Sequence, residues 1–272
     1  DKEIEWTLWA GTVGYESAIP ARVEAAAATG FDRMSLSPID VTSAGDPPAE
    51  LGRRARGEGV SLELEGLMTW YPGDQPAEIP LAAYSADDVL RMAEEVGAVS
   101  MTVLAGPVCE LPIDDISAHF AALCDRAADI GVRVQLEFAP MMAIGDLPSA
   151  LKVVEAADRD NGGLMFDTWH FFRGNPDFGA LEALSGDRVF GVQVADGGEQ
   201  VRGSLAEDTF LRRQPGEGSF DLVRALRILD RIGALKRTGP EVISPDTAAM
   251  APLAAARVGR ERTLDVIGRA RS

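Results

Sequence analysis

The chain has 272 residues, of which 46% are hydrophobic and 25% are charged, and its formal net charge is −17. This length suits one large soluble domain, since a single α/β barrel takes roughly 250 residues. So acidic a surface repels phosphates and anionic lipids, and we therefore expect neither a nucleic-acid partner nor a membrane partner. The segment from Asp1 to Trp6 does not resemble a signal peptide, and the two cysteines, Cys109 and Cys124, form no disulfide framework. These features predict a cytoplasmic location.

Short apolar runs alternate with helical patterns along the whole chain, and no linker interrupts them. We predict strands near 4–10, 31–37, 59–66, 98–104, 131–138, 162–167, 188–195 and 239–243. We predict helices near 16–29, 47–57, 84–96, 113–130, 147–158, 177–185, 219–233 and 249–269, the helix near 219–233 capped by Ser219. Repeated strand–helix units require parallel strands, and about eight of them favour one (β/α)8 TIM barrel domain over residues 1–272. An open doubly wound sheet is the alternative, but residues 10–15 lack a full GxGxxG motif.

Four consecutive predicted strands each carry one oxygen-bearing side chain near the end of the strand. Side chains alternate along a strand, and the apolar residues of 131–138 face the helices, so Glu137 faces the barrel axis. The same alternation points Asp167, Gln193 and Glu241 inward. Active sites of such barrels lie at the C-terminal ends of the strands, where these four side chains would meet.

Three carboxylates at one rim require a counter-charge, because ionised carboxylates are costly to bury unpaired. One divalent cation would supply this charge. A set of oxygen ligands suits Mn²⁺ or Mg²⁺ best, with Co²⁺ and Zn²⁺ as less favoured choices. The alternative is that the four residues are separate structural groups that cap helices or pair with arginines.

Several motifs in the second half of the chain resemble those of the xylose-isomerase-like TIM barrels, the sugar phosphate isomerase and epimerase group. They are Leu136-Glu137-Phe138, Phe166-Asp167-Thr168-Trp169-His170, Val192-Gln193-Val194-Ala195-Asp196 and Arg213-Gln214-Pro215-Gly216-Glu217-Gly218. The resemblance covers residues 131–244 well and the first half only in its strand–helix rhythm. The group includes epimerase-like, hydroxypyruvate isomerase-like, inosose dehydratase-like and 3-dehydroshikimate dehydratase-like enzymes. The resemblance therefore indicates the superfamily more than the substrate.

The resemblance implies a role for each residue at a matching position. The metal ligands would be Glu137, Asp167, Gln193 and Glu241. Glu137 and Glu241 would also be catalytic, moving protons on the substrate. Many relatives have histidine where Gln193 stands, and the glutamine form is more like the hydroxypyruvate isomerase branch.

Substrate contacts follow from the same motifs. His170 and Arg213 would bind substrate oxygens, and Trp169 is a further candidate contact at the mouth, although a tryptophan there can equally be packing. The stretch 197–212 is longer than the compact loop of hydroxypyruvate isomerases, which leaves the placement of Arg213 open. A salt bridge is the alternative role for Arg213 and a structural hydrogen bond the alternative for His170.

Other polar residues allow two interpretations each. Asp196 either orients a ligand or makes an ordinary turn. Glu65 either lines the pocket or fills a polar layer of the barrel. The glycines at 197–198 and 216–218 either bind phosphate or only make turns. His119 is expected on a helix surface without a function.

These observations favour a metal-dependent isomerase or epimerase of a small polyhydroxy carbonyl compound, acting by carboxylate-mediated proton transfer through a metal-stabilised enediolate. A metal-dependent dehydratase of a cyclic polyol ketone, such as an inosose or dehydroshikimate, is the first alternative, and a non-catalytic ligand-binding barrel is the second. Lys2, Lys152 and Lys236 end no predicted strand, which argues against Schiff-base chemistry. No GxSxG motif supports a serine hydrolase. The partner would be a small-molecule substrate, and a homo-oligomer stays open.

Overall fold

Eight parallel strands close into a barrel in chain order, as predicted, with β1 hydrogen-bonded to both β2 and β8. The computed structural model describes residues 4–272, so Lys2 and the first part of the segment compared with signal peptides lie outside the described residues. The strands are β1 (Glu5–Leu8), β2 (Arg33–Leu36), β3 (Ser61–Leu67), β4 (Ser100–Leu104), β5 (Arg133–Glu137), β6 (Gly162–Asp167), β7 (Val189–Val194) and β8 (Arg237–Pro240). The predicted TIM barrel is therefore confirmed.

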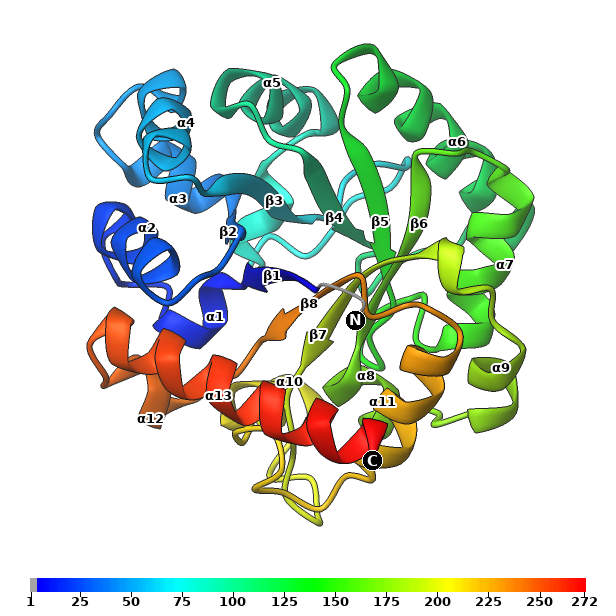
Figure 1. Cartoon of the computed structure of the whole chain (residues 1–272). Coiled ribbons are helices and arrows are strands. Elements are labelled where there is room, and N and C mark those ends of the chain that lie inside the picture. The colour runs from blue at the N-terminus through cyan, green and yellow to red at the C-terminus, as the bar shows by residue number, and fades with distance from the viewer. Residues whose placement is uncertain (1–3) are drawn as a thin grey trace.

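A ring of helices surrounds the strands (Figure 1). The longer helices are α2 (Ile19–Ala28), α4 (Pro48–Gly57), α5 (Ala86–Val96), α6 (Ile113–Asp129), α7 (Leu147–Ala157), α9 (Phe178–Ala183), α11 (Leu222–Arg231) and α13 (Pro252–Arg271). Each of them lies at a predicted helix. In the part of the chain that the structure describes, none is long and apolar enough to cross a membrane.

Short helices in the loops were not predicted from the sequence. They are α1 (Ala10–Val13), α3 (Pro38–Ser43), α8 (Thr168–Arg173), α10 (Leu205–Asp208) and α12 (Pro245–Ala248), with the 3-10 turns η1 (Pro80–Ala83), η2 (Gly186–Arg188) and η3 (Thr209–Leu211). One or two turns are too short to show a helical period. The predicted cap of α11 was also wrong, because Asp221, not Ser219, accepts a hydrogen bond from the backbone N–H of Arg224.

The core lies between the strands and the helix ring, as the alternation along β5 shows. Val134 and Leu136 are fully buried against the helices. Gln135 points the other way, into the barrel, where its amide donates to Thr102 Oγ1 at 3.0 Å. Glu137 has the same parity as Gln135, so it faces the barrel axis at the end of the strand.

The closing strand β8 begins and ends earlier than its predicted range of 239–243. It ends at Pro240, so Glu241 lies one residue beyond it, but the backbone N–H of Glu241 still donates to Val194 O at 3.1 Å. Gly239 allows the close approach of β1 and β8, since a Cβ atom there would lie 1.8 Å from Thr7 O. The strand is thus shifted, while Glu241 keeps its place at the barrel mouth.

Candidate active site

The end of β6 organises the centre of the site. Asp167 is the last residue of β6 and the N-cap of α8, where its side chain accepts a hydrogen bond from the backbone N–H of His170 at 3.1 Å. The helix therefore starts without any intervening loop. It places the His170 Nε2 atom 3.2 Å from Glu137 Oε1, so that residues of β5 and β6 meet.

A group of buried side chains at this point could hold a metal ion. Glu137, Asp167 and His170 each offer a ligand atom, and these atoms lie within 4.8 Å of one another. Gln193 is the neighbour of Asp167 in the sheet, and its Oε1 atom is buried without a hydrogen-bond partner among the described residues. A buried acceptor oxygen without a partner in a polar site is a feature expected of a side chain that can bind a cation.

Beside the imidazole of His170, Arg212 is the only basic side chain that directly contacts these carboxylates in the described chain. Its Nη1 atom lies 2.7 Å from Asp167 Oδ2 and 3.1 Å from Glu241 Oε2, and the side chain is 98% buried. The guanidinium also lies over the ring of Trp169, 5.2 Å from the ring to its central carbon. Arg212 therefore ties the end of β6 to the residue that follows β8.

One guanidinium compensates one carboxylate. The pKa values of Asp167 and Glu241, which share Arg212, therefore shift in opposite directions. Burial would raise the pKa of Asp167, but the charge of Arg212, with that of His170, lowers it to about 2. Burial is the largest cause that raises the pKa of Glu241 well above its ordinary value; Arg212 opposes this shift, and the charges of Asp167 and Glu137 add to it. The cluster therefore lacks positive charge. With Glu137, Asp167 and Glu241 all ionised, one arginine would leave two negative charges uncompensated, and one divalent cation would match them.

The structure brings most of the predicted site residues together, but not all of them. Glu137, Asp167, Gln193, Glu241 and His170 converge as described above. Arg213 does not join them: its side chain is exposed and donates to Glu217 O at 3.4 Å. Neighbouring side chains point to opposite sides of an extended segment, and Arg213 forms an antiparallel bridge with Asp196, so Arg212 faces the site and Arg213 faces solvent.

Trp169 is fully buried rather than open at the mouth. Its ring packs edge-to-face against His170 and lies below the guanidinium groups of Arg212 and Arg173. In this position Trp169 packs against His170 and Arg212, and it could affect a ligand only by fixing the positions of these two side chains.

The remaining polar candidates have structural surroundings. Asp196 accepts hydrogen bonds from the backbone N–H groups of Gly197, Gly216 and Phe220, which fixes the long loop after β7. A Cβ atom on Gly218 would lie 2.2 Å from Asp196 Oδ1, so this glycine serves a close approach of two segments. These contacts agree with the turn interpretation of Asp196 and of these glycines.

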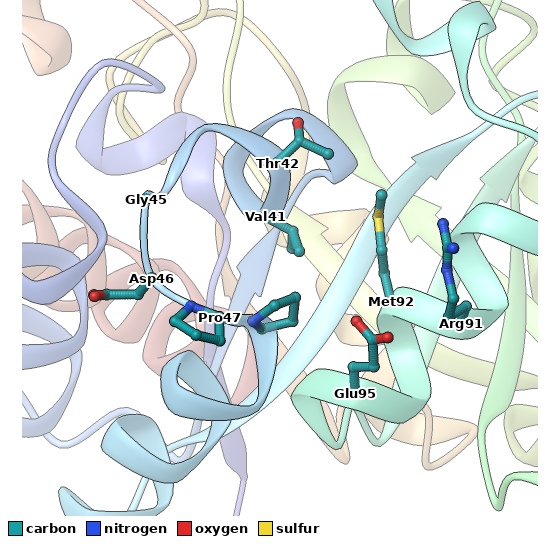
Figure 2. Close-up of a pocket in the computed structure, with 9 residues that line it drawn as sticks. Val41, Thr42, Gly45, Asp46, Pro47, Arg91, Met92 and Glu95 are labelled. Carbon is teal, nitrogen blue, oxygen red and sulfur yellow. The ribbon is translucent and has the colours of Figure 1, made fainter.

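A separate hollow of about 560 Å³ lies between the segment around α3 and helix α5. Figure 2 shows Val41 and Met92 facing each other across it, with Arg91 and Glu95 on the helix side. No residue that lines this hollow belongs to the carboxylate cluster. Among the described residues, the cluster of possible metal-binding side chains thus lies at the barrel mouth and not in this hollow.

Comparison with known proteins agrees with this fold. The family model of the xylose isomerase-like TIM barrel matches residues 23–262. The chain belongs to this family. It is 28% identical over 149 residues to an inosose isomerase of Bacillus subtilis, and the match covers 54% of this chain and 53% of that one. It is 27% identical over 218 residues to a 3-dehydroshikimate dehydratase of Pseudomonas aeruginosa, which covers 78% of this chain and 34% of that one.

Solved structures give the same fold. The crystal structure of the IolI protein with a zinc atom superposes with a TM-score of 0.85 at 19% identity, covering 98% of this chain and 99% of that one. The relatives matched by sequence include an isomerase and a dehydratase, so membership of the family leaves the reaction open. The curated relatives above are matched over about half and one third of their own lengths.

Proposed function

We propose that this chain is a divalent-metal-dependent isomerase or epimerase of a small polyhydroxy carbonyl compound. The observation that carries the proposal is the cluster of three buried carboxylates, Glu137, Asp167 and Glu241, around a single arginine. Burying acids at this cost has no structural benefit that the barrel needs, whereas a metal-dependent proton-transfer site requires it.

The side chains present fit a divalent cation. Glu137, Asp167 and Glu241 would hold it with the unpaired Oε1 atom of Gln193, and His170 lies close enough to contribute a nitrogen. The oxygen-rich set favours Mn²⁺ or Mg²⁺, and a nitrogen ligand would extend the range to Co²⁺ or Zn²⁺. When bound, the ion would supply positive charge beside a substrate oxygen that becomes negative during the reaction.

The two glutamates are suited to move protons because they have different partners. Glu137 contacts His170, and Glu241 contacts Arg212. One of the two carboxylates would remove a proton from a carbon next to the carbonyl group. The other would return a proton, either to the neighbouring carbon or to the opposite face of the same carbon. This pair of transfers is an isomerisation in the first case and an epimerisation in the second.

Substrate oxygens would be bound by His170 and by an arginine, as the family resemblance implies. Arg212 contacts Asp167 and Glu241 whereas Arg213 is exposed, and this contact supports assigning the role to Arg212 in place of Arg213. Trp169 would act beneath it by fixing the plane of the guanidinium.

A dehydratase is the second candidate, and the Glu137–His170 pair favours it. A base and an imidazole 3.2 Å apart can remove a carbon proton and then protonate a departing hydroxyl group on the same side of the substrate. A syn elimination uses such an adjacent base and acid, whereas an epimerisation uses groups on opposite faces of the carbon.

Proton exchange in D₂O tests the proposal and separates the two reactions. We would incubate the metal-loaded protein with ketoses, inososes, hydroxypyruvate and dehydroshikimate, and follow NMR spectra and ultraviolet absorbance. Deuterium next to the carbonyl group with no loss of water supports the isomerase or epimerase. A conjugated-enone absorbance that grows as water is lost identifies a dehydratase. If no compound exchanges a proton, the proposed reaction is wrong.

A further inference from the structure

A buried ion pair holds the long loop between β7 and α11. Asp208, the last residue of α10, has its Oδ2 atom 2.8 Å from the Nε atom of Arg173, the last residue of α8. Both side chains are more than nine-tenths buried. The Nη2 atom of Arg173 also donates to the backbone carbonyl oxygens of Gly198 and Gln200. One arginine therefore contacts both the first part and the later part of this loop.

The ion pair has no charge to spare for a ligand. The second carboxylate oxygen of Asp208 accepts a hydrogen bond from the backbone N–H of Arg202 at 3.0 Å. The guanidinium of Arg173 lies over the rings of Phe220, at 4.9 Å, and Trp169, at 5.9 Å. These contacts surround a fully compensated pair, so Asp208 serves the loop and not the metal-binding cluster.

Thr209 connects this ion pair to the arginine of the site. It follows Asp208 directly and begins the turn η3. Arg212 donates from Nε to the carbonyl oxygen of Thr209 at 3.2 Å and from Nη2 to its hydroxyl oxygen at 3.1 Å. The Nη1 atom of Arg212 is the one that contacts Asp167 and Glu241. Thr209 thus binds one edge of the guanidinium and leaves the opposite nitrogen directed at the two acids.

The backbone contacts of Arg212 fix its main chain but not its guanidinium. Its N–H donates to Ile243 O at 3.0 Å, and the next residue, Arg213, bridges to Asp196. Several rotatable bonds separate the guanidinium from this backbone, and ordering them costs entropy. The two hydrogen bonds to Thr209 restrict the guanidinium to one orientation, in which it can contact both acids.

We propose that Asp208 and Thr209 are positioning residues, which keep the guanidinium of Arg212 against the two metal-binding acids. The pair of Asp208 with Arg173 fixes the turn, and Thr209 holds the guanidinium within it. The inference rests on the proposed function, because it concerns how the same site is held in shape. Both residues would act on the acids only through Arg212.

Limited digestion of the metal-free protein with trypsin tests whether Arg212 is held in place. Its side chain is 98% buried, so cleavage after Arg212 requires the side chain to leave the acids. Asp208→Asn should speed the release of fragment 1–212 by about tenfold or more, because Arg173 then stays buried without a counter-charge. Thr209→Val removes one hydrogen-bond acceptor and should speed it by about threefold. Mass spectrometry distinguishes this fragment from those that end at Arg202 or Arg213.

Calorimetric titration with Mn²⁺ tests whether Asp208 acts through Arg212. The guanidinium places a positive charge beside the oxygens that would bind the ion, so Arg212→Met should bind Mn²⁺ at least about threefold more tightly. Asp208→Asn should tighten the binding in the same direction when Arg212 is present. In the Arg212→Met background it should have no further effect. A general loosening of the barrel would instead change the affinity equally in both backgrounds.

Matched controls alter the same kinds of group away from the site. Asp125→Asn breaks an exposed ion pair with Arg159 on the outer helices, and Thr42→Val removes a surface hydroxyl that contacts Tyr84. Neither should change the release of fragment 1–212 or the affinity for Mn²⁺. Circular dichroism checks that all variants are folded. Thr209→Val replaces one hydroxyl by a methyl group, so it tests the inference even if Asp208→Asn fails to fold.

Two results would overturn the inference. One is release of fragment 1–212 at the parent rate in the folded variants Asp208→Asn and Thr209→Val. The other is an affinity for Mn²⁺ that Asp208→Asn leaves unchanged, or changes equally with and without Arg212→Met. If the parent protein binds no Mn²⁺, the proposed function is contradicted instead, and the digestion alone decides whether Asp208 and Thr209 position Arg212.

Discussion

The two ends of the barrel differ in how their acidic side chains are paired with arginines. At the N-terminal end, Glu5 is paired with both Arg33 and Arg237, and Glu63 is paired with Arg33, so each acid has an arginine. At the C-terminal end, Asp167 and Glu241 share Arg212, and the buried Glu137 contacts His170. The first arrangement is electrically complete without a ligand. The second, with all three acids ionised, would be complete only when a divalent cation is added, and we therefore propose that the function lies at the C-terminal end.

The largest expected effect is the loss of turnover when the acids of the C-terminal end are neutralised. Glu137→Gln and Glu241→Gln should each reduce the rate of carbon–deuterium exchange by about 10²–10⁴-fold, because a positioned acid or base contributes this much. NMR in D₂O measures the rate, and circular dichroism checks the fold. Glu5→Gln at the other end and His119→Ala on α6 should exchange at the normal rate. Near-normal exchange in either glutamine variant of the mouth would contradict its assignment as a proton carrier.

The arginines at the two ends should differ in their effect on stability. Arg212→Met leaves Asp167 and Glu241 buried without a counter-charge, and we expect it to lower the free energy of unfolding of the metal-free protein by about 3–5 kcal/mol. Arg237→Met removes a partly exposed pair with Glu5 and should cost about 0–1 kcal/mol. Urea unfolding of both variants compares the two ends directly. Equal losses in the free energy of unfolding would contradict the difference in charge pairing between the two ends.

Adding a divalent ion should stabilise the protein through the C-terminal end alone. At a free ion concentration 100 times the dissociation constant, the free energy of unfolding rises by about 2.7 kcal/mol. Thermal unfolding with Mn²⁺, Mg²⁺, Co²⁺, Zn²⁺ or a chelator measures this gain. Gln193→Leu should reduce the gain without destabilising the metal-free protein, because it removes a buried acceptor that has no partner. A melting temperature that stays unchanged with every ion and with the chelator would contradict the metal site.

A smaller effect concerns pH and Glu65. The pKa of Glu65 is raised from 4.5 to about 8 in the folded protein. Between these values the folded protein holds a proton that the unfolded chain has released, so stability falls as pH rises, by at most about 1.4 kcal/mol per pH unit. Glu65→Gln lacks this titration, and its stability relative to the metal-free parent protein should increase between about pH 5 and pH 8. Urea unfolding at several pH values measures the difference, and parallel curves would contradict the raised pKa.

Sequence reasoning located the parts of the site that lie on regular strands. Strand alternation predicted that Glu137, Asp167 and Gln193 face the barrel axis, as they do. Side chains alternate with a period of two, so the direction of each follows once the apolar face of the strand is known. Glu241 was also placed at the mouth, although β8 ends before it, since its backbone continues the pairing with β7. The order of the eight strands followed from the repeated strand–helix units.

The irregular loops were beyond the reach of these patterns. Arg212 and Arg213 are adjacent, and only the antiparallel bridge between Asp196 and Arg213 determines which of them faces the site. This long-range contact determines the direction of the two side chains, and the local sequence does not contain it.

The pairing of β1 with β8 has a consequence for the order of folding. It joins Glu5 to Arg237, and Thr12 Oγ1 donates to Pro240 O at 2.8 Å across 228 residues of chain. Contacts of such high sequence separation form slowly, because a long loop must close before they are gained. Glu241 follows this last strand directly, so the full set of acids assembles only when the barrel closes. Capture of a divalent ion should therefore accompany the final step of refolding, and ion-dependent fluorescence during refolding would report that step.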